Sequence, residues 1–251
     1  MSLAPPRHDV PPHDDPLAEA PGHRTEALTH ADLVERYARM AHTFERRRVD
    51  QVLRGLDLGL SGLALLVFAP VMALITAVML LAGGPVLYRG PRVGRGGHIF
   101  TMYKFRTLRV DAEQRLGSTY GPALTVRTAG EQTRVGRLLR ASKLDELPQL
   151  INVLRGDMSI VGPRPIRPAF FAELCETIPQ YWQRLVVRPG LTGFAQLRLT
   201  REMTWAEKLA HDFEYIADRS VRLYVSIVAQ TAALVASRPI AALLGRPRTW
   251  A

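Results

Sequence analysis

The chain has 251 residues, of which 47% are hydrophobic and 22% are charged, so most of it can fold around a hydrophobic core. Its formal charge of +10 indicates an anionic partner, such as a phosphorylated ligand, an acidic lipid or a nucleic acid. A single cysteine, Cys175, excludes an intrachain disulfide and a cysteine-rich zinc site.

The first 48 residues divide into a polar tail and a helix. Residues 1–28 are rich in proline and poor in apolar residues, which predicts a disordered tail. No apolar segment follows a basic start there, so the tail is not a signal peptide. Residues 29–48 carry apolar side chains at helical spacing and predict an amphipathic helix. This helix either packs on the domain or lies on a membrane, and the arginines at 46–48 favour the membrane.

Residues 49–87 are predicted to form a membrane anchor. No charged residue occurs from Leu58 to Leu87, a stretch of 30 residues, whereas a spanning helix needs about 20. Pro70 lies near the middle and removes a helical hydrogen bond, so the helix bends or breaks there. Arginines flank both ends, and basic flanks stay on the cytoplasmic side. These features favour a re-entrant helix bent at Pro70, with a kinked single pass as the alternative.

Residues 88–251 are predicted to be the catalytic domain, and they begin with a hairpin. Two short strands lie within residues 85–108, around a glycine-rich turn at residues 94–97. In the second strand, Lys104 and Arg106 share one face, opposite Ile99, Thr101, Tyr103 and Phe105. On the hairpin alone, the Lys104 face is expected to be the solvent-exposed one.

The rest of the domain is predicted to be mainly helical, which makes the fold mixed α/β and helix-rich. Residues 134–155 form two helical pieces divided near Ala141, and Gly156 closes the second piece. Further helices are expected at 170–185, interrupted at Pro179, and at 205–217. Residues 223–236 are apolar but too short to span, so they form either a core helix or a second surface-lying helix.

Two adjacent carboxylates, Asp145 and Glu146, are the strongest chemical feature. Adjacent carboxylates repel each other unless a cation holds them. Acidic residues also occur near helix starts simply to cap the helix, and for the pair alone this is the simpler interpretation. If the pair is functional, a helix N-terminus lowers the pKa of a carboxylate and keeps it ionised as a nucleophile or magnesium ligand. Carboxylates can attack phosphorus to give acyl phosphates.

Two arginines lie in loops that proline makes rigid. Arg164 occurs in Gly-Pro-Arg-Pro and Arg188 in Arg-Pro-Gly-Leu-Thr-Gly. A rigid loop reduces the entropy lost on binding, and a guanidinium group suits phosphate oxygens. The alternative is that both are turn arginines in solvent. Together with the carboxylate pair, they indicate metal-assisted chemistry on a phosphorylated substrate.

In their order and spacing, these motifs resemble the bacterial sugar transferase family, the monotopic phosphoglycosyl transferases, over roughly residues 49–236. The resemblance rests on the proline-broken anchor and on the following segments: Tyr103-Lys104-Phe105-Arg106-Thr107, Asp145-Glu146-Leu147-Pro148-Gln149, Gly156-Asp157-Met158-Ser159, Val161-Gly162-Pro163-Arg164-Pro165 and Pro189-Gly190-Leu191-Thr192-Gly193. The chain looks like a small-form member without the long multi-pass N-terminal extension.

The resemblance implies a two-step reaction at the cytoplasmic face of the bacterial inner membrane. Asp145 would attack the β-phosphate of a UDP-sugar, release UMP and carry the phosphosugar. Polyprenyl (undecaprenyl) phosphate would then accept it, as the first step of exopolysaccharide or glycoconjugate assembly. Glu146 would bind Mg²⁺. The residues implied in phosphate and nucleotide contacts are Arg140, Lys104, Arg106, Arg164 and Arg188.

The resemblance is incomplete in places, and other functions make different predictions. Residues 129–131 and 199–200 depart from the family pattern, and Tyr224 stands where an aspartate is common, so the sugar is not defined. The oligomeric state is left open, a homo-oligomer included. An inactive scaffold that binds anionic lipid would show no nucleotide turnover. A nucleic-acid binder fits the net charge, but the sequence contains no recognition motif for one.

Overall fold

The structure is a computed structural model and describes residues 48–112, 115, 127–198 and 203–243. The predicted tail at 1–28 and nearly all of the predicted amphipathic helix at 29–48 lie outside this part of the chain. The described part is helix-rich with two small sheets, which confirms the mixed fold class.

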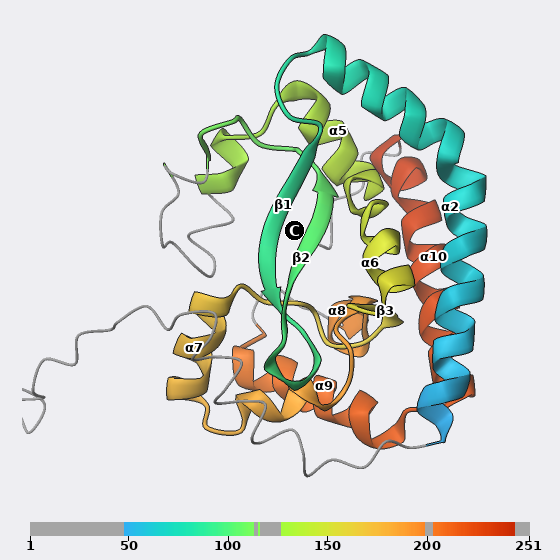
Figure 1. Ribbon diagram of the computed structural model, residues 1–251, viewed down its shortest axis with the longest axis vertical. Helices are drawn as coiled ribbons and strands as arrows, with labels where there is room; N and C mark the ends of the chain where they lie inside the picture. Colours follow the sequence, from blue (N-terminus) through green and yellow to red (C-terminus); the bar gives the residue numbers. More distant parts are fainter. Residues whose placement is uncertain (1–47, 113–114, 116–126, 199–202, 244–251) are drawn as a thin grey trace, which may run out of the picture.

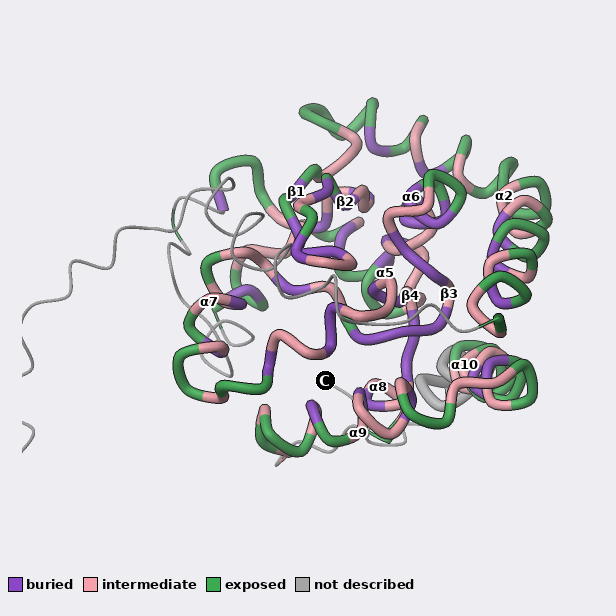
Figure 2. The backbone as a smooth tube through the Cα atoms, turned by 60° about the horizontal axis from the view of Figure 1, so that its bottom comes forward, coloured by how far each residue is buried: buried purple, intermediate pink, exposed green. Residues whose placement is uncertain are grey.

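The predicted anchor begins with one long helix, α2 (Val49–Leu81), which contains Pro70. Figure 1 shows an uninterrupted ribbon whose last part is inclined to its first, so the helix bends without breaking. It is long and apolar enough to cross a membrane, and 11% of its most apolar window is buried. Figure 2 shows exposed residues along much of its length. The re-entrant path of this helix stays a prediction.

A hairpin follows the anchor, as predicted. Strands β1 (Leu87–Val93) and β2 (Ile99–Phe105) pair antiparallel, and a short 3-10 turn, η1 (Arg95–Gly97), joins them. The interpretation of the Lys104 face as the solvent-exposed one is wrong. Phe100 and Met102 on that face are buried against Val153 and Met158, whereas Thr101 on the opposite face is exposed. Strand alternation defines two faces, but only the packing partner decides which one is covered.

The predicted division of residues 134–155 into two helices is confirmed. Helix α5 (Arg134–Ser142) starts at Thr133, whose hydroxyl accepts a hydrogen bond from the Gly136 amide (2.9 Å). It ends at Lys143, which has a left-handed backbone (φ 62°) and turns the chain. A 3-10 turn, η2 (Leu144–Glu146), then leads into α6 (Gln149–Arg155), which ends at Gly156 (φ 91°).

The second half of the domain packs around a short parallel pair of strands, β3 (Ser159–Val161) and β4 (Gly190–Thr192). The remaining elements are α7 (Pro168–Thr177), the 3-10 helix η3 (Tyr181–Val186), α8 (Phe194–Arg198), α9 (Trp205–Asp218) and α10 (Val221–Leu243). The helix predicted at 205–217 and the interruption near Pro179 are therefore confirmed.

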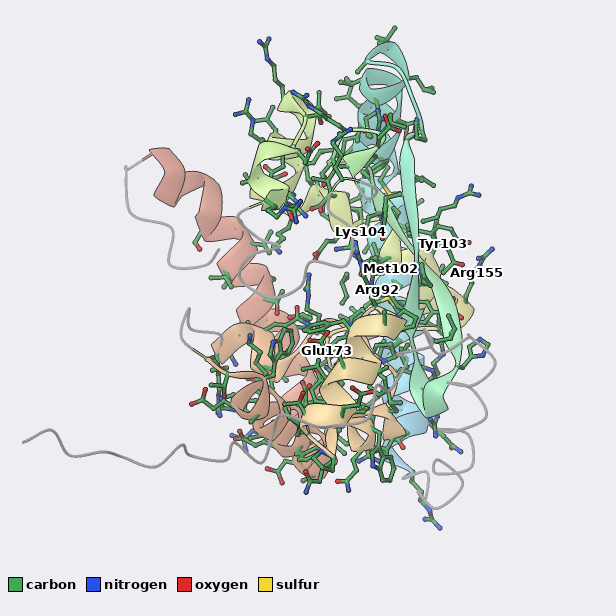
Figure 3. The ribbon with its side chains drawn as sticks, turned by 90° about the vertical axis from the view of Figure 1, so that its left-hand side faces the viewer. Arg92, Met102, Tyr103, Lys104, Arg155 and Glu173 are labelled. Carbon is green, nitrogen blue, oxygen red and sulfur yellow. The ribbon has the colours of Figure 1, made fainter. Side chains whose placement is uncertain are left out.

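Helix α10 contacts α2 near its own start, where the Tyr224 hydroxyl donates to Asp57, and Figure 3 shows its later part running away from α2. Its Tyr224 and Ile227 are fully buried, whereas Val221 and Val225 are exposed. The helix therefore contributes one face to the core, and its apolar character extends onto the surface.

Candidate active site

The two predicted catalytic carboxylates lie in η2, between α5 and α6. Asp145 is 5% exposed, and the side chain of Glu146 is 15% exposed. Burying one carboxylate is costly, and burying two neighbours is costlier still, unless cations compensate. The surroundings of the pair therefore decide its chemistry.

Glu146 is surrounded by cations. Its Oε1 lies 3.1 Å from Lys104 Nζ, 3.6 Å from an Arg164 Nη and 3.8 Å from Lys143 Nζ. Burial alone would raise the pKa of Glu146, but these cations outweigh it and hold the pKa well below its ordinary value. Glu146 is therefore ionised, and it anchors positive charge beside Asp145.

Asp145 has a different environment. Burial, followed by the neighbouring negative charge of Glu146, raises the pKa of Asp145, and nearby cations offset only part of this. The expectation that a helix start would lower the pKa of Asp145 is wrong, because loss of hydration dominates. Its Oδ1 has no hydrogen-bond partner within the described part of the chain. A carboxylate with an elevated pKa is more basic than an exposed one, which favours attack on an electrophile.

Three of the predicted substrate-binding cations gather at this pair. Besides Lys104 and Arg164, Arg140 in the last turn of α5 acts electrostatically on both carboxylates. Burial lowers the pKa of Arg140, and the carboxylates oppose that effect. Such a group of cations can balance the charge of a phosphate.

Arg106 and Arg188 lie elsewhere. Arg106 donates to the Gly83 carbonyl (2.6 Å) and so braces the turn between α2 and β1. Arg188 donates to the Gly156 carbonyl (2.9 Å) and lines a small cavity beside the first turns of α2. The structure does not bring these two arginines to the carboxylate pair, so their role in phosphate binding stays a prediction.

Asn152 holds the strand that carries Lys104. Its Oδ1 accepts from the Tyr103 amide (3.0 Å), and its Nδ2 donates to the Thr101 carbonyl (2.7 Å), so α6 is attached to the edge of β2. Figure 3 shows Lys104 on one side of this strand and Tyr103 with Arg155 on the other. Arg155 donates to the Tyr103 hydroxyl (2.8 Å) on that outer side.

Arg184 holds the loop that carries Arg164, and sequence reasoning missed it. The Arg184 guanidinium lies 2.7 Å from Asp212 Oδ2 and donates to the Arg164 carbonyl (3.0 Å). Its Nη1 also donates to the Tyr181 hydroxyl (3.1 Å). Both members of the ion pair are buried. No local motif marks such a pair, because its members are 28 residues apart.

The carboxylate pair fits a magnesium ion that the substrate helps to bind. Mg²⁺ is commonly held by one or two carboxylates together with substrate phosphates. The unpartnered Oδ1 of Asp145 and the adjacent Glu146 are donors of this kind. Within the described residues, no group of three or more His, Cys, Asp or Glu side chains could hold a metal alone. Oxygens from a phosphate would therefore have to complete the site.

Comparison with known proteins gives a consistent result. The sequence model of the family described as bacterial sugar transferase matches residues 48–238. A UDP-N-acetylgalactosamine-undecaprenyl-phosphate N-acetylgalactosaminephosphotransferase of Aeromonas hydrophila is 40% identical over 183 residues, which cover 71% of this chain and 42% of that protein. A UDP-glucose:undecaprenyl-phosphate glucose-1-phosphate transferase of Caulobacter vibrioides is 41% identical over 194 residues, 74% of this chain and 70% of that protein.

A third relative is only slightly longer than the region that it shares with this chain. The exopolysaccharide production protein PSS of Rhizobium leguminosarum is 38% identical over 184 residues, which cover 70% of this chain and 90% of that protein. The matched region thus makes up most of one relative and less than half of another.

Proposed function

The chain belongs to the bacterial sugar transferase family, and we propose that it transfers a sugar 1-phosphate from a UDP-sugar to undecaprenyl phosphate. The named activities of the Aeromonas and Caulobacter relatives support both substrates. The Rhizobium relative supports a role in exopolysaccharide production. The observation that carries the proposal is the buried Asp145–Glu146 pair with Lys104, Arg140 and Arg164 around it.

In the first step, an Asp145 carboxylate oxygen attacks the β-phosphorus of the UDP-sugar. A phosphorus–oxygen bond forms to Asp145, and the bond to the bridging oxygen breaks. UMP leaves with the electron pair of that bond, and the sugar phosphate remains on Asp145 as an acyl phosphate. The elevated pKa of Asp145 and its unpartnered oxygen support this role.

The surrounding charges have separate tasks. Lys104, Arg140 and Arg164 offset the negative charge of the diphosphate as it approaches the buried carboxylates. Glu146 stays ionised and keeps Lys104 and Arg164 in place. Mg²⁺ held by Asp145 or Glu146 would supply further positive charge at the phosphate oxygens.

In the second step, a phosphate oxygen of undecaprenyl phosphate attacks the phosphorus of the acyl phosphate. The bond to Asp145 breaks and restores its carboxylate, and undecaprenyl diphosphate sugar is the product. This acceptor is lipid-bound, so the site has to lie at a membrane surface. The long apolar helix α2, which is mostly unburied, supports membrane attachment. A re-entrant path bent at Pro70 would leave both arginine-flanked ends on the cytoplasmic face.

Replacement of the nucleophile tests the proposal. Purified Asp145→Asn protein is incubated with undecaprenyl phosphate and, in separate reactions, UDP-glucose, UDP-galactose and UDP-N-acetylgalactosamine, and UMP is measured. We expect a loss of at least about 10³-fold, because an amide is a far weaker nucleophile than a carboxylate. Asp218→Asn, at an exposed position at the end of α9, is the matched control. Substantial turnover by Asp145→Asn would contradict the covalent role.

Labelling of cysteines on both flanks of α2 tests the path of the helix. Gln51→Cys and Arg89→Cys are each introduced into Cys175→Ser protein, because both positions are exposed. In intact inverted membrane vesicles, a membrane-impermeant maleimide should label both positions. Labelling of only one of them would contradict the re-entrant path.

A further inference from the structure

Asp57 is a buried carboxylate within the apolar anchor helix. It is 2% exposed, although most of α2 is not buried by the rest of the protein. Burial of an isolated carboxylate is strongly unfavourable, so such a group persists where donors compensate it. The side chains and backbone around Asp57 provide that compensation.

Three donors converge on one oxygen of Asp57. Its Oδ1 accepts from the Ser159 hydroxyl, the Ile160 amide and the Tyr224 hydroxyl, each at 2.9 Å. Ser159 and Ile160 belong to β3, and Tyr224 belongs to α10. A single oxygen thus joins the anchor helix to two elements of the catalytic domain.

Strand β3 continues directly to the candidate active site. It ends at Val161, and Arg164, which lies 3.6 Å from Glu146, follows three residues later. A shift of β3 relative to α2 would therefore move Arg164 relative to the anchor. Three hydrogen bonds to one oxygen fix the position of Asp57 relative to β3 and α10, which suits a fixed joint of this kind.

The neighbouring turns of α2 are attached to the same domain. Arg54 donates to the carbonyls of Val153 (2.6 Å) and Leu154 (2.9 Å) near the end of α6. Arg219 pairs with Asp50 at 2.7 Å. Among these three attachments, Asp57 lies furthest from the start of α2 and is the one that binds β3. These polar contacts therefore attach the first turns of α2 to the domain, while Ile75 and Met79 in its last turns pack against Phe105 and Leu139 (Figure 1).

We propose that Asp57 is a positioning residue that fixes the height of the carboxylate site above the membrane and is needed for the lipid-dependent step. This inference rests on the proposed function. A UDP-sugar reaches the site from water, so its reaction with Asp145 does not require the site to lie at one height above the bilayer. Undecaprenyl phosphate is confined to the bilayer, so its reaction depends on how far the site lies from the lipid surface. A misplacement of about 1 Å can cost about 10²-fold in rate.

The test separates the two steps in nanodiscs. Exchange of labelled UMP into UDP-glucose, without acceptor, reports the first step, and product formation with undecaprenyl phosphate reports both. UDP-galactose and UDP-N-acetylgalactosamine serve as further arms. For Asp57→Leu, which removes the acceptor oxygen, we expect transfer to fall about 10²-fold and exchange to change less than about threefold. Asp57→Asn keeps an oxygen at the same position and should leave both rates within about threefold of the wild type.

An equal fall in both rates for Asp57→Leu would overturn the proposal, and so would unchanged transfer. Hydrogen exchange of β3 amides gives a readout that does not need activity. Hydrogen exchange of the β3 amides should accelerate in Asp57→Leu and in the milder variant Tyr224→Phe. It should not accelerate in Asp57→Asn or in the control Gln51→Ala, at an exposed position of the same helix. Unchanged protection of β3 in Asp57→Leu would also overturn it. Wild-type protein that shows neither UMP exchange nor transfer with any UDP-sugar would refute the proposed function, and hydrogen exchange of the β3 amides would then still test whether Asp57 holds β3.

Discussion

The buried Arg184–Asp212 pair gives a prediction that separates stability from activity. The two side chains are each about 5% exposed, and they lie 2.7 Å apart. Arg184→Leu leaves Asp212 as an unpaired buried carboxylate, for which we expect a loss of about 3–5 kcal/mol of unfolding free energy. For a chain of this size, that corresponds to a fall in Tm of about 6–20 °C.

The loss should depend on pH in a defined direction. Burial raises the pKa of Asp212 and Arg184 opposes this, so removal of Arg184 raises that pKa further. A carboxyl whose folded pKa exceeds its unfolded pKa destabilises the protein fully above the folded value, and the effect fades as the pH falls. The difference in Tm between wild type and Arg184→Leu should therefore be larger at pH 8 than at pH 5, measured by thermal unfolding in the same detergent.

The double variant Arg184→Met with Asp212→Leu removes both charges and should recover most of the stability. It should not recover activity, because the Arg164 carbonyl still lacks the hydrogen bond that Arg184 donates. An Arg184→Leu protein as stable as the wild type would refute the reasoning. So would a double variant that regains full activity, because Arg184 would then have no part in holding Arg164.

Three further predictions follow from the site and from the packing around it. Lys104→Met should lower UMP release about 10²-fold, as loss of one charge-stabilising group commonly does, whereas Arg155→Met on the other side of β2 should change it little; equal effects would contradict the assignment. On acidification, the rate of UMP release should fall at a pH above the ordinary aspartate pKa, because burial raises the pKa of Asp145. In Lys104→Met this fall should occur at higher pH, since Lys104 lowers the pKa of Asp145. A shift to lower pH would count against the role of Asp145. Gly190→Ala places a Cβ against the backbone that follows β3, so it should lower the free energy of unfolding in denaturant by about 1–3 kcal/mol or more. In Gly55→Ala the new Cβ meets no atom within 4 Å, so the free energy of unfolding should change little.

Local signals predicted the elements that carry the site. The glycine-rich turn between two alternating segments predicted the hairpin, and the proline and glycine around residues 148–156 predicted the second helical piece. The carboxylate pair was visible because both residues are adjacent in the chain. These features depend on neighbours in sequence, which is why they could be predicted.

Features that depend on distant partners could not be predicted in this way. Lys104 faces inward because α6 covers its side of β2, and alternation within the strand carries no information about α6. Asp57 lies just before the apolar stretch and carries no local signal, because its donors Ser159 and Tyr224 are 102 and 167 positions away. The role of Arg184 likewise depends on its ion pair with Asp212 and on its hydrogen bond to the Arg164 carbonyl, which the local sequence does not reveal. The pKa of Asp145 moved against expectation because its burial, a tertiary property, outweighs its place near a helix.

Identification of the covalent adduct tests the central claim most directly. The purified protein is incubated with a UDP-sugar that it turns over, in the absence of undecaprenyl phosphate, quenched, digested and analysed by mass spectrometry. The account predicts one sugar phosphate on the peptide that contains Asp145, and its loss when undecaprenyl phosphate is added before quenching. Release of UMP with the adduct on another residue would contradict it, as would turnover without any adduct.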